Sequence, residues 1–225
     1  MSDDEAPQRR AEVRRVADAL RTLMDRFVAT EAPVGEFAGV ADELEALANR
    51  LAAHEQGHLY LGFAEAANAY GDSDGPFDHS PLMGLSNPLA PPMRLEVLED
   101  SVVGTAILGS AYEGPPGCVH GGFVAAMFDE LLGLTQTLSG KPGMTGRLTV
   151  SYRAPTPLHT ELRFTGTVRS VSGRKIVCHG TIHAGEQLCA ESEGLFIHID
   201  PQKFIEMRDE RDAAVQAANR IADSG

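Results

Sequence analysis

Residues 113–133 decide the fold, and they read Glu113-Gly-Pro-Pro-Gly-Cys-Val-His-Gly-Gly-Phe-Val-Ala-Ala-Met-Phe-Asp-Glu-Leu-Leu-Gly133. A loop rich in proline and glycine leads to His120-Gly121-Gly122, and an apolar run follows it. The apolar side chains of this run, with Leu134 just beyond the stretch, would be spread around nearly the whole of a helix: Phe123, Val124, Met127, Phe128, Leu131, Leu132 and Leu134. Because a helix that is apolar on most sides is a buried one, the stretch predicts a central buried helix.

Two adjacent carboxylates, Asp129 and Glu130, lie inside this apolar run. Successive helix residues point about 100° apart, so the two side chains should face different surroundings. A carboxylate buried among Phe and Met is costly unless something compensates it, and an uncompensated one is a candidate for a shifted pKa and for catalysis. The alternative for Asp129 is an acid that reaches solvent or is satisfied by a neighbour. For Glu130 we expect a salt bridge at the helix edge or a dimer contact.

The glycine pair, Gly121 and Gly122, adds the second half of a site. A helix that begins there exposes free backbone N–H groups, with partial positive charge and no side chain in the way, which suits an oxyanion or a polarised carbonyl. Asp129 lies nine residues after His120, about 13 Å along a helix axis, which is too far to act at the helix start of its own chain. If the acid and the amides act together they come from two copies, so we expect a dimer with shared sites.

The His120-Gly121-Gly122 sequence, followed after six residues by Asp129, resembles the hotdog-fold acyl-CoA thioesterases of the phenylacetate-pathway type. The run Met144-Thr-Gly-Arg-Leu-Thr-Val-Ser-Tyr-Arg-Ala-Pro155 resembles that family's first long strand after the helix, and the turn Ser172-Gly-Arg-Lys175 also fits. The resemblance covers residues 90–199. It implies an α+β hotdog fold, in which an antiparallel sheet wraps around a long central helix.

The resemblance also implies an activity, the hydrolysis of an acyl-CoA thioester to a free acid and CoA, with CoA as part of the substrate and neither cofactor nor metal. In this family the acid that matches Asp129 is a general base or a nucleophile, and direct attack would give a mixed anhydride. The amides of Gly121 and Gly122 polarise the thioester carbonyl. His120 orients the loop or the ligand, so we expect its loss to matter less than that of Asp129. A hydroxyl residue near the start of the next strand places the water or the acid, which implies Thr145, with Thr149 as the alternative.

Basic residues after the helix suggest where CoA binds. Residues 141–175 contain seven basic side chains and one acidic side chain, in a chain of net charge −13. A local basic stretch in an acidic protein indicates an anionic ligand, although solvated charges on alternate strand positions explain it as well. In the family, the turn that holds Ser172, Arg174 and Lys175 contacts the CoA phosphates, and cationic donors on a turn suit phosphates. We include Arg147, from the same basic stretch, among the predicted CoA-binding residues.

The chain departs from the family six positions before the histidine. Relatives often carry a polar amide residue there, commonly Asn, whereas this chain has Gly114, with Glu113 beside it. Because of this difference we keep a second hypothesis, in which the protein is a non-catalytic hotdog protein that binds acyl-CoA or another acyl ligand. A hydratase or dehydratase on the same fold pairs a histidine with an acid in a different motif, which this chain does not contain.

The composition of the chain limits the cellular locations and the classes of binding partner that we expect. The net charge of −13 argues against a nucleic-acid partner, and no run of eighteen apolar residues predicts a membrane span. The acidic N-terminus lacks the apolar segment of a signal peptide. The three cysteines, Cys118, Cys178 and Cys189, form no Cys-x-x-Cys pair, which predicts a reducing cytoplasm and no structural zinc.

Hydrophobic periodicity divides the chain into four parts. We expect a helical hairpin in residues 1–55, an irregular connector in 56–90, the hotdog domain in 91–200 and a C-terminal helix in 201–225. The hairpin should cover part of the sheet or a dimer seam. The expected strands are Met93–Leu98, Ser101–Ala111, Thr145–Arg153, Glu161–Ser170, Lys175–Ala184 and Gln187–Ile199. The expected assembly is a homodimer or a dimer of dimers.

Overall fold

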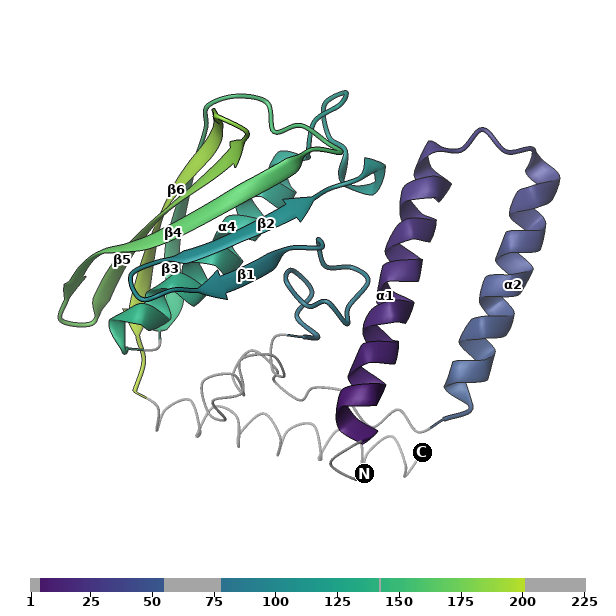
Figure 1. Cartoon of the computed structure of the whole chain (residues 1–225), viewed down its shortest axis with the longest axis horizontal. Helices are drawn as coiled ribbons and strands as arrows, with labels where there is room; N and C mark the ends of the chain where they lie inside the picture. The colour runs from purple at the N-terminus through teal and green to yellow at the C-terminus, as the bar shows by residue number, and fades with distance from the viewer. Residues whose placement is uncertain (1–4, 55–77, 142, 201–225) are drawn as a thin grey trace, which may run out of the picture.

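The computed structural model describes residues 5–54, 78–141 and 143–200 (Figure 1). It has an α+β layout in which a six-stranded antiparallel sheet lies against one long helix, and this confirms the predicted hotdog fold class. The helices are α1 (Glu5–Ala29), α2 (Val34–Ala52) and α4 (Gly121–Thr135), with short 3-10 helices η1 (Ser110–Tyr112) and η2 (Gln136–Ser139). The strands are β1 (Arg94–Val97), β2 (Val102–Ile107), β3 (Gly143–Tyr152), β4 (Glu161–Ser172), β5 (Lys175–Ala184) and β6 (Gln187–His198). The predicted C-terminal helix and most of the predicted connector lie outside the described residues.

The order of the strands places β3 at one edge of the sheet. The order is β1-β2-β4-β5-β6-β3, so the chain leaves β2, forms α4 and returns on the far side. Tight turns then join β4 to β5 and β5 to β6, at Gly173 (φ +60°) and Gly185 (φ +57°), and the first of them lies in the turn named from the sequence. Glycine adopts this left-handed conformation without the steric cost of a side chain.

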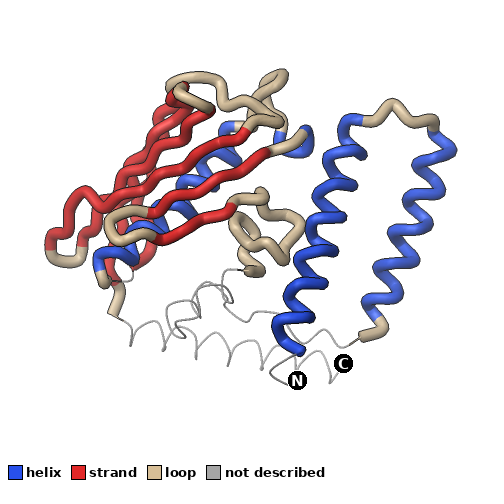
Figure 2. The backbone as a smooth tube through the Cα atoms, viewed as in Figure 1, coloured by secondary structure: helices blue, strands red, loops and turns tan. Residues whose placement is uncertain are grey.

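The helix α4 forms the centre of the hydrophobic core, behind the sheet in Figure 2. Strand residues alternate between the helix side and the opposite side, as the buried positions of β4 and β5 show. The fully or nearly fully buried apolar side chains of α4 are Val124, Met127, Phe128, Leu131 and Leu132. Their main partners on the strands are Val102, Leu162, Phe164, Ile176, Cys178, Ile182 and Phe196. The predicted buried helix is therefore confirmed.

Three strand glycines let α4 approach the sheet closely. A Cβ added at Gly166 would lie 2.2 Å from Thr135 Oγ1, and one at Gly180 would lie 3.0 Å from a methyl group of Leu132. A Cβ at Gly194 would lie 3.1 Å from the other methyl group of Leu132. Gly166 and Gly180 are paired across β4 and β5. The absence of side chains at these positions sets the distance between the helix and the sheet.

The 78–92 loop is anchored to α1 by a buried arginine. The Arg21 guanidinium donates to the backbone carbonyls of Gly84, Leu85, Asn87 and Ala90 at 2.7–3.2 Å. Only 9% of Arg21 is exposed. Four charge-assisted hydrogen bonds to one segment fix its path, because each carbonyl would otherwise need another donor. The loop thereby reaches the side of α4 with a defined conformation.

The helical hairpin covers this loop rather than the sheet. Helix α1 contacts the loop and η1, whereas α2 stands further out in Figure 1 and has no buried residue. The two helices touch where Phe27 and Phe37 meet edge to face, with ring centroids 6.0 Å apart. Both helices lie where the sequence predicted them. No described helix has the length and apolar character that crossing a membrane requires.

We expect Gly166→Ala to lower the free energy of unfolding by about 1–3 kcal/mol, because the new methyl group overlaps the buried Thr135 side chain. Gly133→Ala is the matched control on α4, since nothing lies within 4 Å of an added Cβ there. It should raise stability by about 0.5–1 kcal/mol through helix propensity. Urea denaturation of both variants measures the two effects. Equal losses in the two would contradict the role given to the strand glycines.

Candidate active site

The loop before α4 is closed by its own hydrogen bonds. The Gly114 N–H donates to Cys118 O at 2.9 Å, and the Gly117 N–H donates to the Glu113 carboxylate at 2.6 Å. Gly117 has a φ of +72°, which glycine tolerates. The loop therefore presents His120 to the start of the helix in one conformation.

His120 caps α4. Its Nδ1 accepts a hydrogen bond from the Gly122 N–H at 3.0 Å, and its backbone carbonyl accepts one from the Phe123 N–H at 2.9 Å. Its own N–H donates to Tyr112 O at 2.9 Å. Nδ1 serves as the acceptor in this contact, which leaves Nε2 as the other polar atom of the ring. This geometry suits a side chain that orients the helix start rather than one that removes a proton there.

The two glycine amides differ in their availability. The Gly122 N–H is used by His120, whereas the Gly121 N–H has no acceptor among the residues that the structure describes. Gly121 is the first residue of α4 and is partly exposed. A free donor at the positive end of a helix can bind a carbonyl oxygen or an oxyanion. The structure thus separates two residues that the sequence treated alike.

Asp129 is held by Thr145 of β3. The Thr145 hydroxyl donates to Asp129 Oδ1 at 2.9 Å. The register of β3 against β6 shifts between Thr145 and Arg147, and such bulges redirect side chains. Of the two threonines that the sequence left open, Thr145 is the one placed against the acid. Asp129 is partly exposed in the single chain, because it faces the edge strand of the sheet.

Asp129 and the free amide lie far apart within one chain. Both residues belong to the same continuous helix, Gly121–Thr135. Eight residues of α-helix separate them by about 12 Å. A single carbonyl group therefore cannot contact both from the same chain, as the sequence spacing predicted.

Glu130 faces the other side of α4, against the 78–92 loop. The Ser80 hydroxyl donates to Glu130 Oε1 at 3.4 Å. Burial is the main cause that raises the pKa of Glu130 to about 7, and the neighbouring Asp129 charge raises it further, while the Ser80 hydrogen bond lowers it. No cation pairs with Glu130 among the described residues, so the expected salt bridge at the helix edge is not found, whereas the expected dimer contact stays a prediction. The side chain is half-buried against a loop of its own chain.

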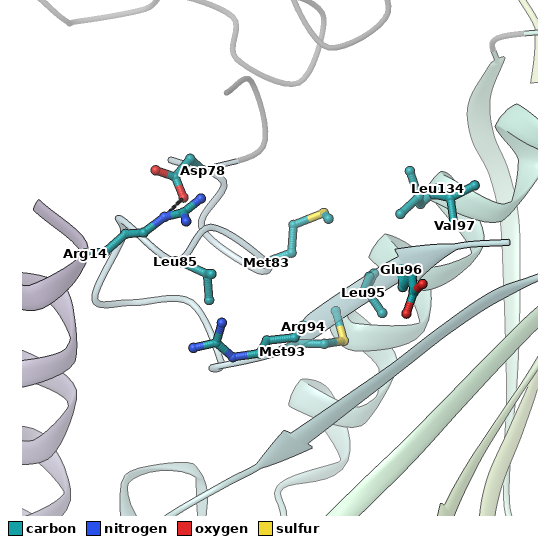
Figure 3. A pocket seen from close by; sticks show the side chains of 10 residues that line it. All are labelled: Arg14, Asp78, Met83, Leu85, Met93, Arg94, Leu95, Glu96, Val97 and Leu134. Atoms are coloured by element: carbon teal, nitrogen blue, oxygen red, sulfur yellow. Dashed lines mark hydrogen bonds and ion pairs between the residues drawn. The ribbon is translucent and has the colours of Figure 1, made fainter. Parts of the chain in front are cut away.

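A cavity of about 560 Å³ lies on this same side of the helix (Figure 3). Leu134, one turn beyond Glu130, lines it together with apolar side chains of the 78–92 loop and β1, and Arg14 and Asp78 form an ion pair at its edge (2.8 Å). The cavity is not on the side of α4 that carries Asp129 and Thr145.

Position 114, where the family resemblance leads us to expect an amide side chain, has no room for one. A Cβ added at Gly114 would lie 2.7 Å from His120 Cα and 3.1 Å from its Cβ. The neighbouring Glu113 carboxylate closes the loop through Gly117 instead of pointing to the helix start. Glycine at position 114 is thus required by the close approach of two backbone segments.

The predicted CoA-binding residues fall into two places. Ser172, Arg174 and Lys175 lie together at the β4–β5 turn, where Arg174 Nε donates to His198 O at 3.1 Å. Lys141 joins them, because its Nζ donates to Gly173 O at 3.4 Å. In a separate place, on β3, Arg147 lies 3.8 Å from the Glu193 carboxylate, and both side chains are exposed.

Two polar contacts at the site were missed by the sequence analysis. The Tyr152 hydroxyl donates to Gly121 O at 2.8 Å, and Ser80 donates to Glu130. Tyr152 lies in the run Met144–Pro155, which resembles the family, so its place in that run could have marked it as a candidate site residue. Ser80 lies 50 residues before its partner in an irregular segment, where no local pattern marks it.

The raised pKa of Glu130 predicts a pH dependence of stability. Between its ordinary pKa of 4.5 and about 7, the unfolded chain releases a proton that the folded chain keeps, so stability falls as pH rises through this window. The loss reaches about 3 kcal/mol by about pH 8. Glu130→Gln cannot ionise, so it should be more stable than wild type at about pH 8 and lack this part of the slope. Urea denaturation across the window tests this, and identical slopes in the two proteins would contradict it.

An amide side chain at position 114 should destabilise this protein. Gly114→Asn is expected to lower the free energy of unfolding by about 1–3 kcal/mol without raising any activity, because the side chain overlaps His120. Gly114→Ala should show most of the same loss, since the overlap begins at Cβ. Thermal unfolding of the two variants measures this. A stable Gly114→Asn protein would show that the loop can open.

Comparisons with known proteins agree with this architecture. Residues 116–191 match the sequence model of the thioesterase superfamily. A solved crystal structure described as a thioesterase superfamily protein is 39% identical, with a TM-score of 0.72, and the match covers 82% of this chain and 94% of that one.

Matches to named enzymes are shorter. "Acyl-coenzyme A thioesterase THEM4" from Mus musculus is 34% identical over 97 residues, 42% of each chain. The Xenopus laevis protein of the same name is 36% identical over 95 residues, 41% of this chain and 43% of its own length. The aligned part of this chain thus spans less than half the length of these curated relatives. The fold, the family match and the long structural match together mean that the chain belongs to the thioesterase superfamily.

Proposed function

We propose that this protein is an acyl-CoA thioesterase, which hydrolyses a thioester to a free acid and CoA. The observation that carries the proposal is the hydrogen bond from Thr145 to Asp129 of α4. The first N–H of the same helix, that of Gly121, has no acceptor among the described residues. The names of the matched relatives support the substrate class. The His120-Gly121-Gly122 and Asp129 spacing favours the phenylacetate-pathway type within the superfamily.

The proposed enzyme works as a homodimer in which each site uses two chains. The ~12 Å between Gly121 and Asp129 within one helix prevents a single chain from completing a site. Asp129 faces Thr145 on β3, an edge strand whose outer side has no partner strand among the described residues. A second copy placed along this edge would bring its own helix start to the acid. A dimer of such dimers uses the same sites.

The proposed chemistry needs only water and the groups of the chain. The thioester carbonyl oxygen accepts a hydrogen bond from Gly121 of one protomer, which stabilises the negative charge that develops on it. Asp129 of the other protomer takes a proton from water as the water oxygen attacks the carbonyl carbon. The tetrahedral intermediate then expels the CoA thiolate, which leaves as the thiol after protonation. Thr145 holds one carboxylate oxygen, so that the other is free to act as the base.

Cys178 and Cys189 are poor candidates for a nucleophile. Burial raises the pKa of Cys178 to about 12 and also raises that of Cys189. All three cysteines are unpaired, and thiols of raised pKa supply little thiolate. This supports hydrolysis through a carboxylate, and unpaired thiols agree with the reducing cytoplasm that we propose as the location.

We assign the CoA phosphates to the β4–β5 turn. The positive charges of Lys141, Arg174 and Lys175 gather there with Ser172, and the Lys141 and Arg174 side chains donate hydrogen bonds to the backbone carbonyls of Gly173 and His198. Arg147 is a weaker candidate, because it already lies beside the Glu193 carboxylate. Cations on an ordered turn bind phosphate without first having to be brought together.

The alternative is a non-catalytic protein of the same superfamily that binds acyl-CoA. One observation favours it, namely that position 114 cannot hold the amide side chain that relatives often carry. Such a protein would keep the helix start and the basic turn, and it would bind an acyl-CoA without cleaving it.

Asp129→Asn should reduce the rate of thiol release from acyl-CoA by at least about 100-fold, because it removes the base and keeps the shape. The assay is a panel of short, aromatic and long acyl-CoAs with a thiol reagent. Asp42→Asn, on the exposed helix α2, changes the net charge equally and should leave the rate unchanged. Equal rates for wild type and Asp129→Asn would defeat the assignment. Binding of a non-hydrolysable acyl-CoA thioether with no turnover of any thioester would favour the alternative.

A further inference from the structure

The hydroxyl of Tyr152 is attached to the first peptide of α4. Tyr152 is the last residue of β3, and its Oη donates to Gly121 O at 2.8 Å. The side chain is 56% exposed, so burial alone does not hold it there. The Gly121 carbonyl also accepts the ordinary i+4 hydrogen bond of the helix, and its second lone pair takes the hydroxyl.

The tyrosine ring lies close over Gly121. A Cβ added at Gly121 would lie 3.3 Å from Tyr152 Oη and 3.5 Å from two ring carbons. The ring and the hydroxyl of Tyr152 thus lie close to the Gly121 Cα, beside the amide that is left free.

The peptide between Gly121 and Gly122 is hydrogen-bonded at both ends. Its carbonyl accepts from Tyr152, and its N–H donates to His120 Nδ1. A peptide group fixed in this way cannot rotate, and consecutive hydrogen bonds polarise one another. The Gly121 N–H, attached to the same Cα, is therefore held in one direction and left free.

We propose that Tyr152 is a positioning residue that fixes the helix start so that the Gly121 N–H points at the substrate carbonyl oxygen. This inference rests on the proposed thioesterase function. The chain has a particular need for such a residue, because position 114, which carries an amide side chain in many relatives, cannot hold one here. Strand β3 then positions both the base and the carbonyl-binding N–H. Thr145 donates to the Asp129 carboxylate, and Tyr152 donates to the Gly121 carbonyl and so fixes the helix start.

Tyr152→Phe is expected to lower kcat about tenfold and to leave KM within about twofold, because the lost hydrogen bond orients a donor that acts mainly in the transition state. Tyr112→Phe is the matched control. Its hydroxyl also donates to a backbone carbonyl, Ala90 O at 3.1 Å, but it is buried beside the 78–92 loop. The control should lose stability and keep kcat.

Amide spectra separate the proposal from a general structural effect. In a TROSY ¹H–¹⁵N spectrum, Tyr152→Phe should shift the Gly122 and Gly121 amides, because the Gly121 carbonyl loses a donor. Tyr112→Phe should leave both amides in place. The proposal is overturned if kcat is unchanged, if only KM rises, or if kcat falls while the two amides stay in place.

The two hypotheses fail in different ways. A wild type that hydrolyses no thioester defeats the proposed function, and with it the catalytic purpose of Tyr152. The amide shifts then still decide whether the hydroxyl orients the helix start. Turnover by wild type with an unchanged rate in Tyr152→Phe leaves the proposed function standing and removes only this residue from it.

Discussion

The close contact between α4 and the sheet is the constraint on which the rest of the structure depends. Gly166, Gly180 and Gly194 have no side chains to hold the helix away, so its large apolar residues lie directly on the strands. Packing at this density fixes the rotation of the helix and its distance from the sheet, because a change of even one methyl group in volume alters the stability of a close-packed core. The free amide of Gly121 and the carboxylate of Asp129 are two points on this one rigid body. Their separation is therefore set by helix geometry and is insensitive to loop motion.

The edge strand β3 contacts both the Asp129 carboxylate and the start of α4. Thr145 lies near one end of the strand and donates to the Asp129 carboxylate, and Tyr152 lies at the other end and donates to the Gly121 carbonyl. A bulge after Thr145 allows the hydroxyl to reach Asp129 while the strand remains paired with β6. Because the strand is at the edge of the sheet, both contacts lie where a second chain can approach. The exposure of Asp129 in one chain is a consequence of this position.

The sequence predicted what depends on local patterns. Helical and alternating periodicity located α4 and the strands, and the apolar surroundings singled out Asp129 and Glu130. The surroundings of Glu130 could not be predicted, because Ser80 comes from a distant segment whose path is set by the hydrogen bonds of Arg21. The same is true of Gly114, whose requirement for glycine arises from the approach of His120 in space. Tyr152 was visible as part of a motif, but only the fold brings its hydroxyl to Gly121.

The two adjacent carboxylates acquire different environments because a helix turns them in different directions. Asp129 faces an edge strand and a hydroxyl donor, whereas Glu130 is half-buried against the 78–92 loop, which removes part of its solvation. A carboxyl group whose pKa lies at about 7 is largely neutral below that pH, so it places less negative charge beside Asp129 than a solvated glutamate would. The loop that α1 anchors through Arg21 is what buries Glu130. The N-terminal helix thus influences the charge next to the candidate base, although it contacts neither Asp129 nor the start of α4 directly.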